Sequence, residues 1–251
     1  MREPLPEAGS QTPGGGRRVA FFGGSFDPPH LGHLAVARAA RAALGLDAVL
    51  FAPVGTQPLK PHGSAVGFED RLAMTRLAIA GELGFAVSLA DAPQPSGAPN
   101  YTLETLLGLR AELPPDSALF CLMGADSFFT LRLWHRAAEI PFAAPLIVAS
   151  RPGQRLDDLQ VALPAGLTIE SIAETDRPGS GVEVRSYLLL NRAGDRTSFY
   201  VLPGLNVEIS ASEIREQIRE LARAPAATPI AGHELLPGAV LDYIRSRGLY
   251  R

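Results

Sequence analysis

The sequence has few cysteines and histidines and no long apolar run, and each shortage excludes a class of protein. Its 251 residues include one cysteine and five histidines. Cys121 alone cannot form an internal disulfide, which indicates a reducing compartment, and so few thiols and imidazoles leave little material for a structural zinc site. Since no apolar run reaches the roughly 18 residues of a membrane span, we expect no membrane partner.

Positive charge is not in excess either. The chain carries 23 Lys and Arg against 26 Asp and Glu, a formal net charge of -3 at pH 7. This balance argues against a nucleic-acid partner bound through a broad cationic surface, but it permits a local anion pocket. With 46% hydrophobic and 20% charged residues, the composition is typical of a globular protein. We therefore expect a cytoplasmic protein.

Apolar, β-branched or aromatic runs alternate along the chain with helical patterns. We predict strands over residues 19–22, 48–53, 85–90, 118–124, 145–150 and 198–204. We predict helices over residues 30–44, 68–80, 101–113, 209–224 and 236–250. Such alternation is typical of βαβ units, so the predicted fold is α/β, with a parallel sheet covered on both faces.

The stretches outside this alternation define the expected domain organisation. Residues 1–18 lack the apolar core of a signal peptide and are predicted to form a disordered tail. Residues 19–251 are predicted to form a single domain. Within it, regularity fades over residues 151–196, where polar turns surround a few short apolar pieces. We interpret this region as an insertion or a set of surface loops.

The string GGSFDPPHLGH, residues 23–33, joins the first predicted strand to the first predicted helix. Ligands of a parallel sheet bind beyond the carboxyl ends of the strands, where Gly23 and Gly24 let backbone N–H groups approach an anion. His30 and His33 share one face of the first helical turn, whose free N–H groups favour phosphate. The alternative for a histidine pair at this spacing is a structural role or part of a metal site, which taken alone is about as frequent as a role in binding phosphate. The complete string favours a site for a phosphoryl group.

That string on a strand–turn–helix resembles the HxGH nucleotidyltransferases, and within them the bacterial nicotinate-nucleotide adenylyltransferases. The resemblance runs from about Val19 to Tyr250 and is loosest over residues 151–196. It implies a Rossmann-like, doubly wound parallel sheet with a C-terminal helical segment. It also implies that ATP and nicotinate mononucleotide are the small-molecule substrates, giving nicotinate adenine dinucleotide and pyrophosphate with Mg²⁺ as cofactor.

Two further motifs support the resemblance on the phosphate side. The segment ISASEIR is similar to the second signature of the family, with Ser212 at a helix start and Arg215 one turn along. Lys60 in QPLKPH matches a family lysine, although the usual Pro-Pro-His-Lys reads Gln-Pro-Leu-Lys here. His62 would replace the missing histidine, or it is an ordinary loop residue. A plain capped amphipathic helix is the alternative for the first motif.

Two motifs support it on the mononucleotide side. The segment NYTLETL resembles the Tyr-Thr element of the family, in which Thr102 and the backbone at Tyr101 contact the nicotinate end. The segment GADSFFTLRLW resembles the next element, in which Trp134 stacks on the pyridine ring. A helix N-cap is the alternative for Thr102, and a core position is the alternative for Trp134.

The resemblance assigns a role to each candidate residue. Catalysis is expected of His30, His33, Lys60 and Arg215. ATP contacts are expected of Gly23, Gly24, Ser25, Phe26, His33, Gly124, Asp126, Ser210, Ser212 and Arg215. Mononucleotide contacts are expected of Lys60, Tyr101, Thr102, Trp134 and Arg151. No side chain is assigned as a metal ligand, since magnesium would bridge phosphate oxygens.

The expected chemistry is attack of the mononucleotide 5′-phosphate on the α-phosphorus of ATP. A phosphate is already ionised at neutral pH, so positioning and electrostatics would carry catalysis without a general base. Three alternatives stay open: another phosphate acceptor such as nicotinamide mononucleotide, a class I aminoacyl-tRNA synthetase fragment, and a nucleotide-binding module without turnover. The sequence leaves the oligomeric state open, and a homo-oligomer is compatible with it.

Overall fold

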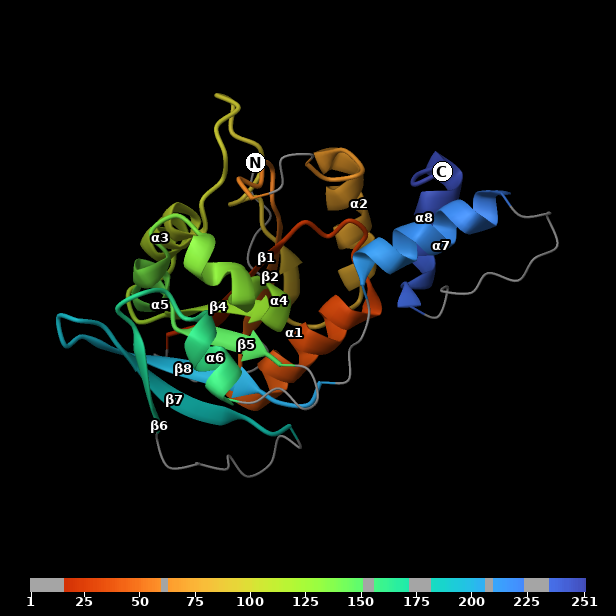
Figure 1. Ribbon diagram of the computed structural model, residues 1–251. Coiled ribbons are helices and arrows are strands. Elements are labelled where there is room, and N and C mark those ends of the chain that lie inside the picture. Colours follow the sequence, from red (N-terminus) through yellow and green to blue (C-terminus); the bar gives the residue numbers. More distant parts are fainter. Residues whose placement is uncertain (1–15, 60–62, 151–155, 172–181, 206–209, 224–234) are drawn as a thin grey trace.

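The computed structural model describes residues 16–59, 63–150, 156–171, 182–205, 210–223 and 235–251 (Figure 1). Most of the expected N-terminal tail, together with Lys60, His62 and Arg151, lies outside these ranges. None of the helices within them has the length and apolar character needed to cross a membrane.

Within the described ranges, one mixed sheet of eight strands has the order β3-β2-β1-β4-β5-β8-β7-β6. The strands are β1 Arg18–Gly24, β2 Ala48–Pro53, β3 Phe85–Val87, β4 Ala118–Gly124, β5 Leu146–Ala149, β6 Thr168–Ser171, β7 Arg185–Leu190 and β8 Arg196–Leu202. The six strands from β3 to β8 in this order are parallel, whereas β7 and β6 run antiparallel to their neighbours. The predicted α/β fold with a largely parallel sheet is confirmed.

Helices cover both faces of this sheet. They are α1 Leu31–Leu44, α2 Phe68–Ile79, α3 Thr102–Glu112, α4 Ala125–Thr130, α5 Ile140–Ala143, α6 Leu156–Ala162, α7 Ala211–Arg223 and α8 Gly238–Arg247, with short 3₁₀ turns η1 Leu131–Leu133 and η2 Ala137–Glu139. Side chains alternate across each strand, so Phe21 enters the core under α3, α4, α5 and α6. Phe22, the next residue, enters the core under α1 and α2.

A third, smaller core joins the end of the chain to the rest. Met74 of α2 packs with Ile214 of α7 and with Val240 and Ile244 of α8. Figure 1 shows α7 and α8 together at the α2 side of the molecule, away from β6 and β7. Gly248, with φ +62°, ends α8 in the left-handed conformation that glycine adopts without strain. The C-terminal helical segment expected from the resemblance is therefore present.

The region expected to hold loops contains regular structure in its described part. Helix α6 and strands β6 and β7 lie within residues 151–196, and β7 pairs with β8 as an antiparallel hairpin. Asn191 closes the turn, since its Oδ1 accepts the backbone N–H groups of Ala193 and Asp195, both at 2.9 Å. Only Tyr187 and Leu189 of β7 are fully buried, because the strand lies near the sheet edge. An alternation of buried and exposed residues as short as that of β7 is a weak signal for predicting a strand from sequence.

Two glycines give opposite predictions for stability. Gly108 lies exposed inside α3 with no atom within 4 Å of the position that a Cβ would take. Gly108→Ala should therefore raise the free energy of unfolding by about 1 kcal/mol.

Gly55 gives the opposite prediction. A Cβ at Gly55 would lie 2.5 Å from the backbone of Pro93, so Gly55→Ala should lower the free energy of unfolding by about 1–3 kcal/mol. Urea unfolding of both variants measures the two changes. A stable Gly55→Ala protein would show that the loop at Pro93 moves aside.

Candidate active site

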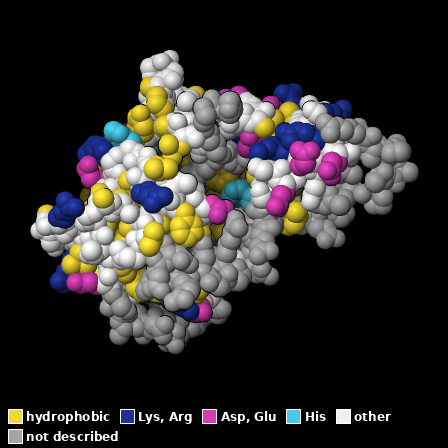
Figure 2. All heavy atoms as spheres, in the orientation of Figure 1, with side chains coloured by type: hydrophobic (Ala, Val, Ile, Leu, Met, Phe, Trp, Pro, Cys, Tyr) yellow, Lys and Arg dark blue, Asp and Glu magenta, His cyan; other side chains and the backbone are white. Residues whose placement is uncertain are grey.

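A cavity of about 830 Å³ opens at the carboxyl ends of β1 and β4, between which the strand order reverses. Open α/β sheets bind ligands at such a switch point, because the two loops there diverge to opposite faces. Figure 2 shows the hollow near the centre of this face, with histidine and acidic side chains at its wall. Loops after β1, β2, β3, β4 and β5 and the start of α7 line the cavity.

Every candidate residue from the sequence that falls within the described ranges lines this cavity. They are Gly23, Gly24, Ser25, Phe26, His30, His33, Tyr101, Thr102, Gly124, Asp126, Trp134, Ser210, Ser212 and Arg215. Lys60 and Arg151, the two other candidates, lie outside the described residues, as does His62. The structure therefore gathers segments almost 200 residues apart around one space, which is large enough for a nucleotide.

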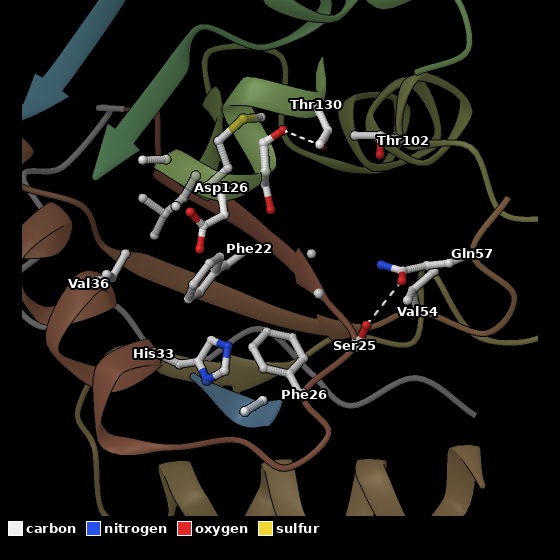
Figure 3. Close-up of a pocket in the computed structure, with 18 of the residues that line it drawn as sticks. Phe22, Ser25, Phe26, His33, Val36, Val54, Gln57, Thr102, Asp126 and Thr130 are labelled. Carbon is white, nitrogen blue, oxygen red and sulfur yellow. Dashed lines mark hydrogen bonds between the residues drawn. The ribbon is translucent and has the colours of Figure 1, made fainter. Parts of the chain in front are cut away.

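The two histidines of the HxGH string form a stacked pair at the start of α1. Their ring centroids lie 3.7 Å apart at an interplanar angle of 31°. The backbone N–H of His30 donates to Nδ1 of His33 at 3.2 Å, which leaves Nε2 of His33 to carry the proton of the neutral ring. Figure 3 shows the His33 ring beside Phe26 and facing Phe22, with Asp126 beyond Phe22. His33 is thus oriented as a hydrogen-bond donor.

Both imidazoles are neutral near pH 7. Burial lowers the pKa of His30 to about 4. Burial, and then the neighbouring His30, lower the pKa of His33 well below its usual value of 6.5. A buried Nδ1 of His30 has no hydrogen-bond partner among the described residues. These groups suit donation to an anion that enters the cavity, and such weakly basic rings are poor proton acceptors.

A buried arginine that the motifs do not include fixes the turn after β1. Arg71 of α2 is 2% exposed, and its guanidinium donates to the carbonyls of Ser25 at 2.7 Å and Val54 at 2.8 Å. These bonds join the turn after β1 to the end of β2. Burial lowers the pKa of Arg71, but not far enough to discharge a guanidinium. The helical spacing from Phe68 places Arg71 on the apolar stripe of α2, which is the signal that could have identified it.

Arg215 brings α7 to the same turn. Its Nη1 donates to the carbonyl of Asp27 at 2.7 Å, and its Nη2 donates to Oγ of Ser212 at 3.0 Å. The predicted proximity of the second signature to the HxGH string is therefore present in the fold. Asp27, which is 5% exposed, was part of the string but had no role in the sequence analysis.

The end of the cavity that was predicted to hold a mononucleotide is formed by the start of α3 and the segment after α4. Tyr101 is the N-cap residue of α3 and Thr102 is the first helical residue, so the cap expected as an alternative for Thr102 is wrong. Trp134 is half-buried, and its indole N–H donates to Oγ1 of Thr130 at 3.3 Å. The rings of Tyr101 and His135 lie 4.5 Å apart. Aromatic faces thus gather at this end of the cavity.

Asp91 is a second residue that the sequence analysis missed. It lines the cavity, is 5% exposed, and accepts a hydrogen bond from the hydroxyl of Thr105 at 2.7 Å. Burial raises the pKa of Asp91 to about 6, and the bond from Thr105 opposes this shift. Its neighbour Asn100 joins the same loops, since it accepts from the backbone N–H of Thr56 and donates to the carbonyl of Ala92.

Comparison with known proteins gives the family. A family model described as cytidylyltransferase-like matches residues 21–217. A Gloeobacter violaceus protein named "Probable nicotinate-nucleotide adenylyltransferase" is 38% identical over 94% of this chain and 97% of its own length. A Pelobacter propionicus protein of the same name is 36% identical over 93% of this chain and 98% of its own. The chain belongs to the nicotinate-nucleotide adenylyltransferase family.

Solved structures agree with this family at the level of the fold. A Plasmodium falciparum nicotinic acid mononucleotide adenylyltransferase complexed with NaAD gives a TM-score of 0.64 at 16% identity, covering 93% of this chain and 97% of that chain. The same protein complexed with APC gives a TM-score of 0.63 at 14% identity, with the same coverage of both chains. The Rossmann-like fold and the family expected from the HxGH string are confirmed.

The raised pKa of Asp91 gives this nicotinate-nucleotide adenylyltransferase family member a testable pH dependence. A carboxyl group whose pKa rises on folding favours the folded state when it is protonated. As the pH rises from about 4 to 6, Asp91 therefore loses its proton and the free energy of unfolding falls. Asp91→Asn keeps an acceptor for Thr105 and cannot ionise. We expect the variant to gain up to about 3 kcal/mol relative to the wild type above pH 6, and nothing below pH 4.

The measurement is urea unfolding of both proteins from pH 4 to 8. The wild-type curve also contains the opposite contribution of His30, whose lowered pKa makes stability fall as pH falls from 6.5 towards 4. That contribution is common to both proteins and cancels in the difference. A difference that stays constant over the whole range would show that Asp91 does not titrate as stated.

Proposed function

We propose that this chain transfers the adenylyl group of ATP to nicotinate mononucleotide, forming nicotinate adenine dinucleotide and pyrophosphate in NAD biosynthesis. One observation carries the proposal: the HxGH histidines, Ser212 and Arg215 meet across one cavity whose other end holds Tyr101 and Trp134. Phosphate-binding groups and aromatic rings in one space fit a polyanion beside a flat heterocycle. The family, in which relatives carry that activity in their names, supports the same reaction.

The proposed reaction is an in-line displacement held by preorganised donors. The mononucleotide phosphate attacks the α-phosphorus of ATP, and the bond to the bridging oxygen of pyrophosphate breaks. His33 Nε2–H, Arg215 and backbone N–H groups of residues 23–26 would hold the phosphate oxygens as charge redistributes in the transition state. No step needs a proton acceptor, in keeping with the low pKa of His30. Lys60 and Arg151 stay candidates for the same anions.

Magnesium is part of the proposal. Within the described ranges, no three His, Cys, Asp or Glu side chains gather as they would around a metal ion. Mg²⁺ is commonly held by substrate phosphates and water, with one or two carboxylates at most. Asp126 points into the cavity opposite His33 (Figure 3) and is the side chain that would contact its water shell. When bound, the ion would neutralise charge on the phosphates.

We also propose a cytoplasmic location for this chain. The one cysteine, Cys121, is buried in β4, and burial raises the pKa of its thiol to about 12, so it is neither exposed nor reactive. We place the reaction in the cytoplasm, where ATP and pyridine mononucleotides are available as substrates. A homo-oligomer is compatible with the fold.

His33→Ala tests the proposed donor. Removing one preorganised donor from an oxyanion site lowers kcat by about 10²–10³-fold, so we expect a loss of this size with little change in the KM for the mononucleotide. Steady-state pyrophosphate release measures both constants, and the melting temperature checks the fold. An unaltered kcat would remove His33 from the transition-state contacts.

Trp134→Ala tests the assignment of the two ends of the cavity. Loss of the indole face should raise the KM for nicotinate mononucleotide about tenfold, because an aromatic stack contributes about 1 kcal/mol or more in a desolvated site. The KM for ATP should stay within twofold. If only the ATP constant changed, the tryptophan would belong to the adenosine end.

The reaction itself is tested by pyrophosphate release from ATP and Mg²⁺ with each pyridine mononucleotide in turn. Turnover with the nicotinate form supports the proposal, and faster turnover with the nicotinamide form would replace the substrate. ATP binding without pyrophosphate release, with any mononucleotide, would make the chain a nucleotide-binding module. Exchange of pyrophosphate that depends on an amino acid would instead indicate a synthetase-like activity.

A further inference from the structure

Tyr250 follows the last helix and reaches back to the turn that borders the cavity. The residue is 7% exposed and belongs to the third core. Its hydroxyl donates a hydrogen bond to Oδ1 of Asp27 at 2.7 Å, across 223 residues of sequence. The backbone of Tyr250 has φ +64°, a left-handed conformation that is strained for an aromatic residue and must be held by its surroundings. The tyrosine itself does not line the cavity.

Asp27 has three acceptor oxygens, and a different segment of the chain occupies each of them. Oδ1 accepts from Tyr250 at 2.7 Å, and Oδ2 accepts from the backbone N–H of Ala65 at 2.5 Å. The main-chain carbonyl accepts from Nη1 of Arg215 at 2.7 Å. Asp27 therefore joins the C-terminal segment, the segment before α2 and helix α7 at the turn between β1 and α1.

The negative charge of the Asp27 carboxylate makes its hydrogen-bond donors important for anion binding in the cavity. A carboxylate beside a phosphate site opposes anion binding unless donors engage it and fix its direction. The cations facing this carboxylate and the Tyr250 ring are Arg71, which is committed to two backbone carbonyls, and Arg215. Burial and the charge of Asp27 raise the pKa of Tyr250, so its hydroxyl keeps the proton and stays a donor.

Without the hydroxyl, Oδ1 of Asp27 would be a buried charged acceptor with no partner, which is costly. A turn of the carboxylate towards Arg215 would satisfy it. That guanidinium would then pair with Asp27 in place of a phosphate oxygen, and the turn would lose its present geometry. The effect would therefore appear first in the binding of ATP.

We propose that Tyr250 is a positioning residue of the active site, which by donating to Asp27 keeps that carboxylate from Arg215 and leaves the guanidinium to ATP. The kinetic test of this role rests on the proposed adenylyl transfer, but ATP binding can be measured whether or not the protein catalyses that reaction. Tyr250 touches no substrate and acts through Asp27.

Tyr250→Phe removes the hydroxyl and keeps the ring in the third core. We expect the Kd and KM for ATP to rise about tenfold or more, as for the loss of a buried hydrogen bond to a charged group, with a fall in kcat. The KM for the mononucleotide should stay within about twofold. Calorimetric titration with ATP and steady-state pyrophosphate release measure these constants, and the melting temperature reports the fold.

Tyr243→Phe is the matched control from the same C-terminal segment. The hydroxyl of Tyr243 donates to Oδ1 of Asp70 in α2 at 2.9 Å, so the variant also loses one tyrosine–aspartate bond between this segment and the rest of the molecule. Neither of these two residues lines the cavity. We expect any fall in melting temperature to come with unaltered kinetic constants, which separates positioning from general stability.

A double-mutant cycle with Arg215→Ala tests the route of the effect. If Tyr250 acts through Asp27 and Arg215, Tyr250→Phe should change the Kd for ATP less than twofold once Arg215 is absent. Equal effects in both backgrounds, wild-type ATP constants for Tyr250→Phe, or a variant that fails to fold would each overturn the proposal and leave Tyr250 with a stabilising role only. If the wild type binds ATP but shows no turnover, the proposed function fails, whereas the ATP titrations still decide the role of Tyr250.

Discussion

The guanidinium of Arg71, buried under the turn after β1, sets the shape of the cavity wall that precedes the HxGH histidines. A buried charge without partners costs several kcal/mol, so it persists only where hydrogen bonds and nearby opposite charge offset that cost. Arg71 has both, since it donates to the carbonyls of Ser25 and Val54 and faces the carboxylate of Asp27. The same interaction joins β1, β2 and α2, so the turn is fixed before any substrate arrives.

At the start of α1, next to this fixed turn, the two imidazoles of the HxGH string carry no charge near pH 7. His30 is buried and His33 half-buried, and both are neutral because loss of hydration lowers their pKa values; a backbone N–H orients His33. Oriented donors in a site of low dielectric stabilise an anion without the reorganisation that mobile cations require. The proposed recognition of a triphosphate therefore rests on geometry and does not require a broad cationic surface.

Much of the fold follows from patterns within short stretches of sequence. The strands over residues 48–53 and 118–124 were predicted with their observed ends, because turn residues flank compact apolar runs. The HxGH string and the second signature indicated the cavity residues through their resemblance to the motifs of the family. Strands β6 and β7 were missed, since an edge hairpin is stabilised mainly by its pairing with β8 and carries a short alternation.

Contacts between distant segments could not be predicted from one sequence. The bonds of Asp27 to Tyr250 and of Arg71 to Ser25 join residues 223 and 46 positions apart, and neither has a local signature. Asp91 likewise has no motif, because its burial depends on how the loops after β2 and β3 pack. The side chains of the motifs were thus visible in the sequence, whereas those that hold them in place became visible only in the fold.

Ile214 and Arg215 are adjacent in α7, yet the first is 1% exposed in the third core and the second lines the cavity. That core is small and separate from the two that flank the sheet, so it is the part of the molecule that can open while the sheet stays intact. Release of α7 and α8 would carry the arginine away from the triphosphate. Heat inactivation would then begin as a local, reversible event at one end of the molecule, and bound nucleotide would protect against it.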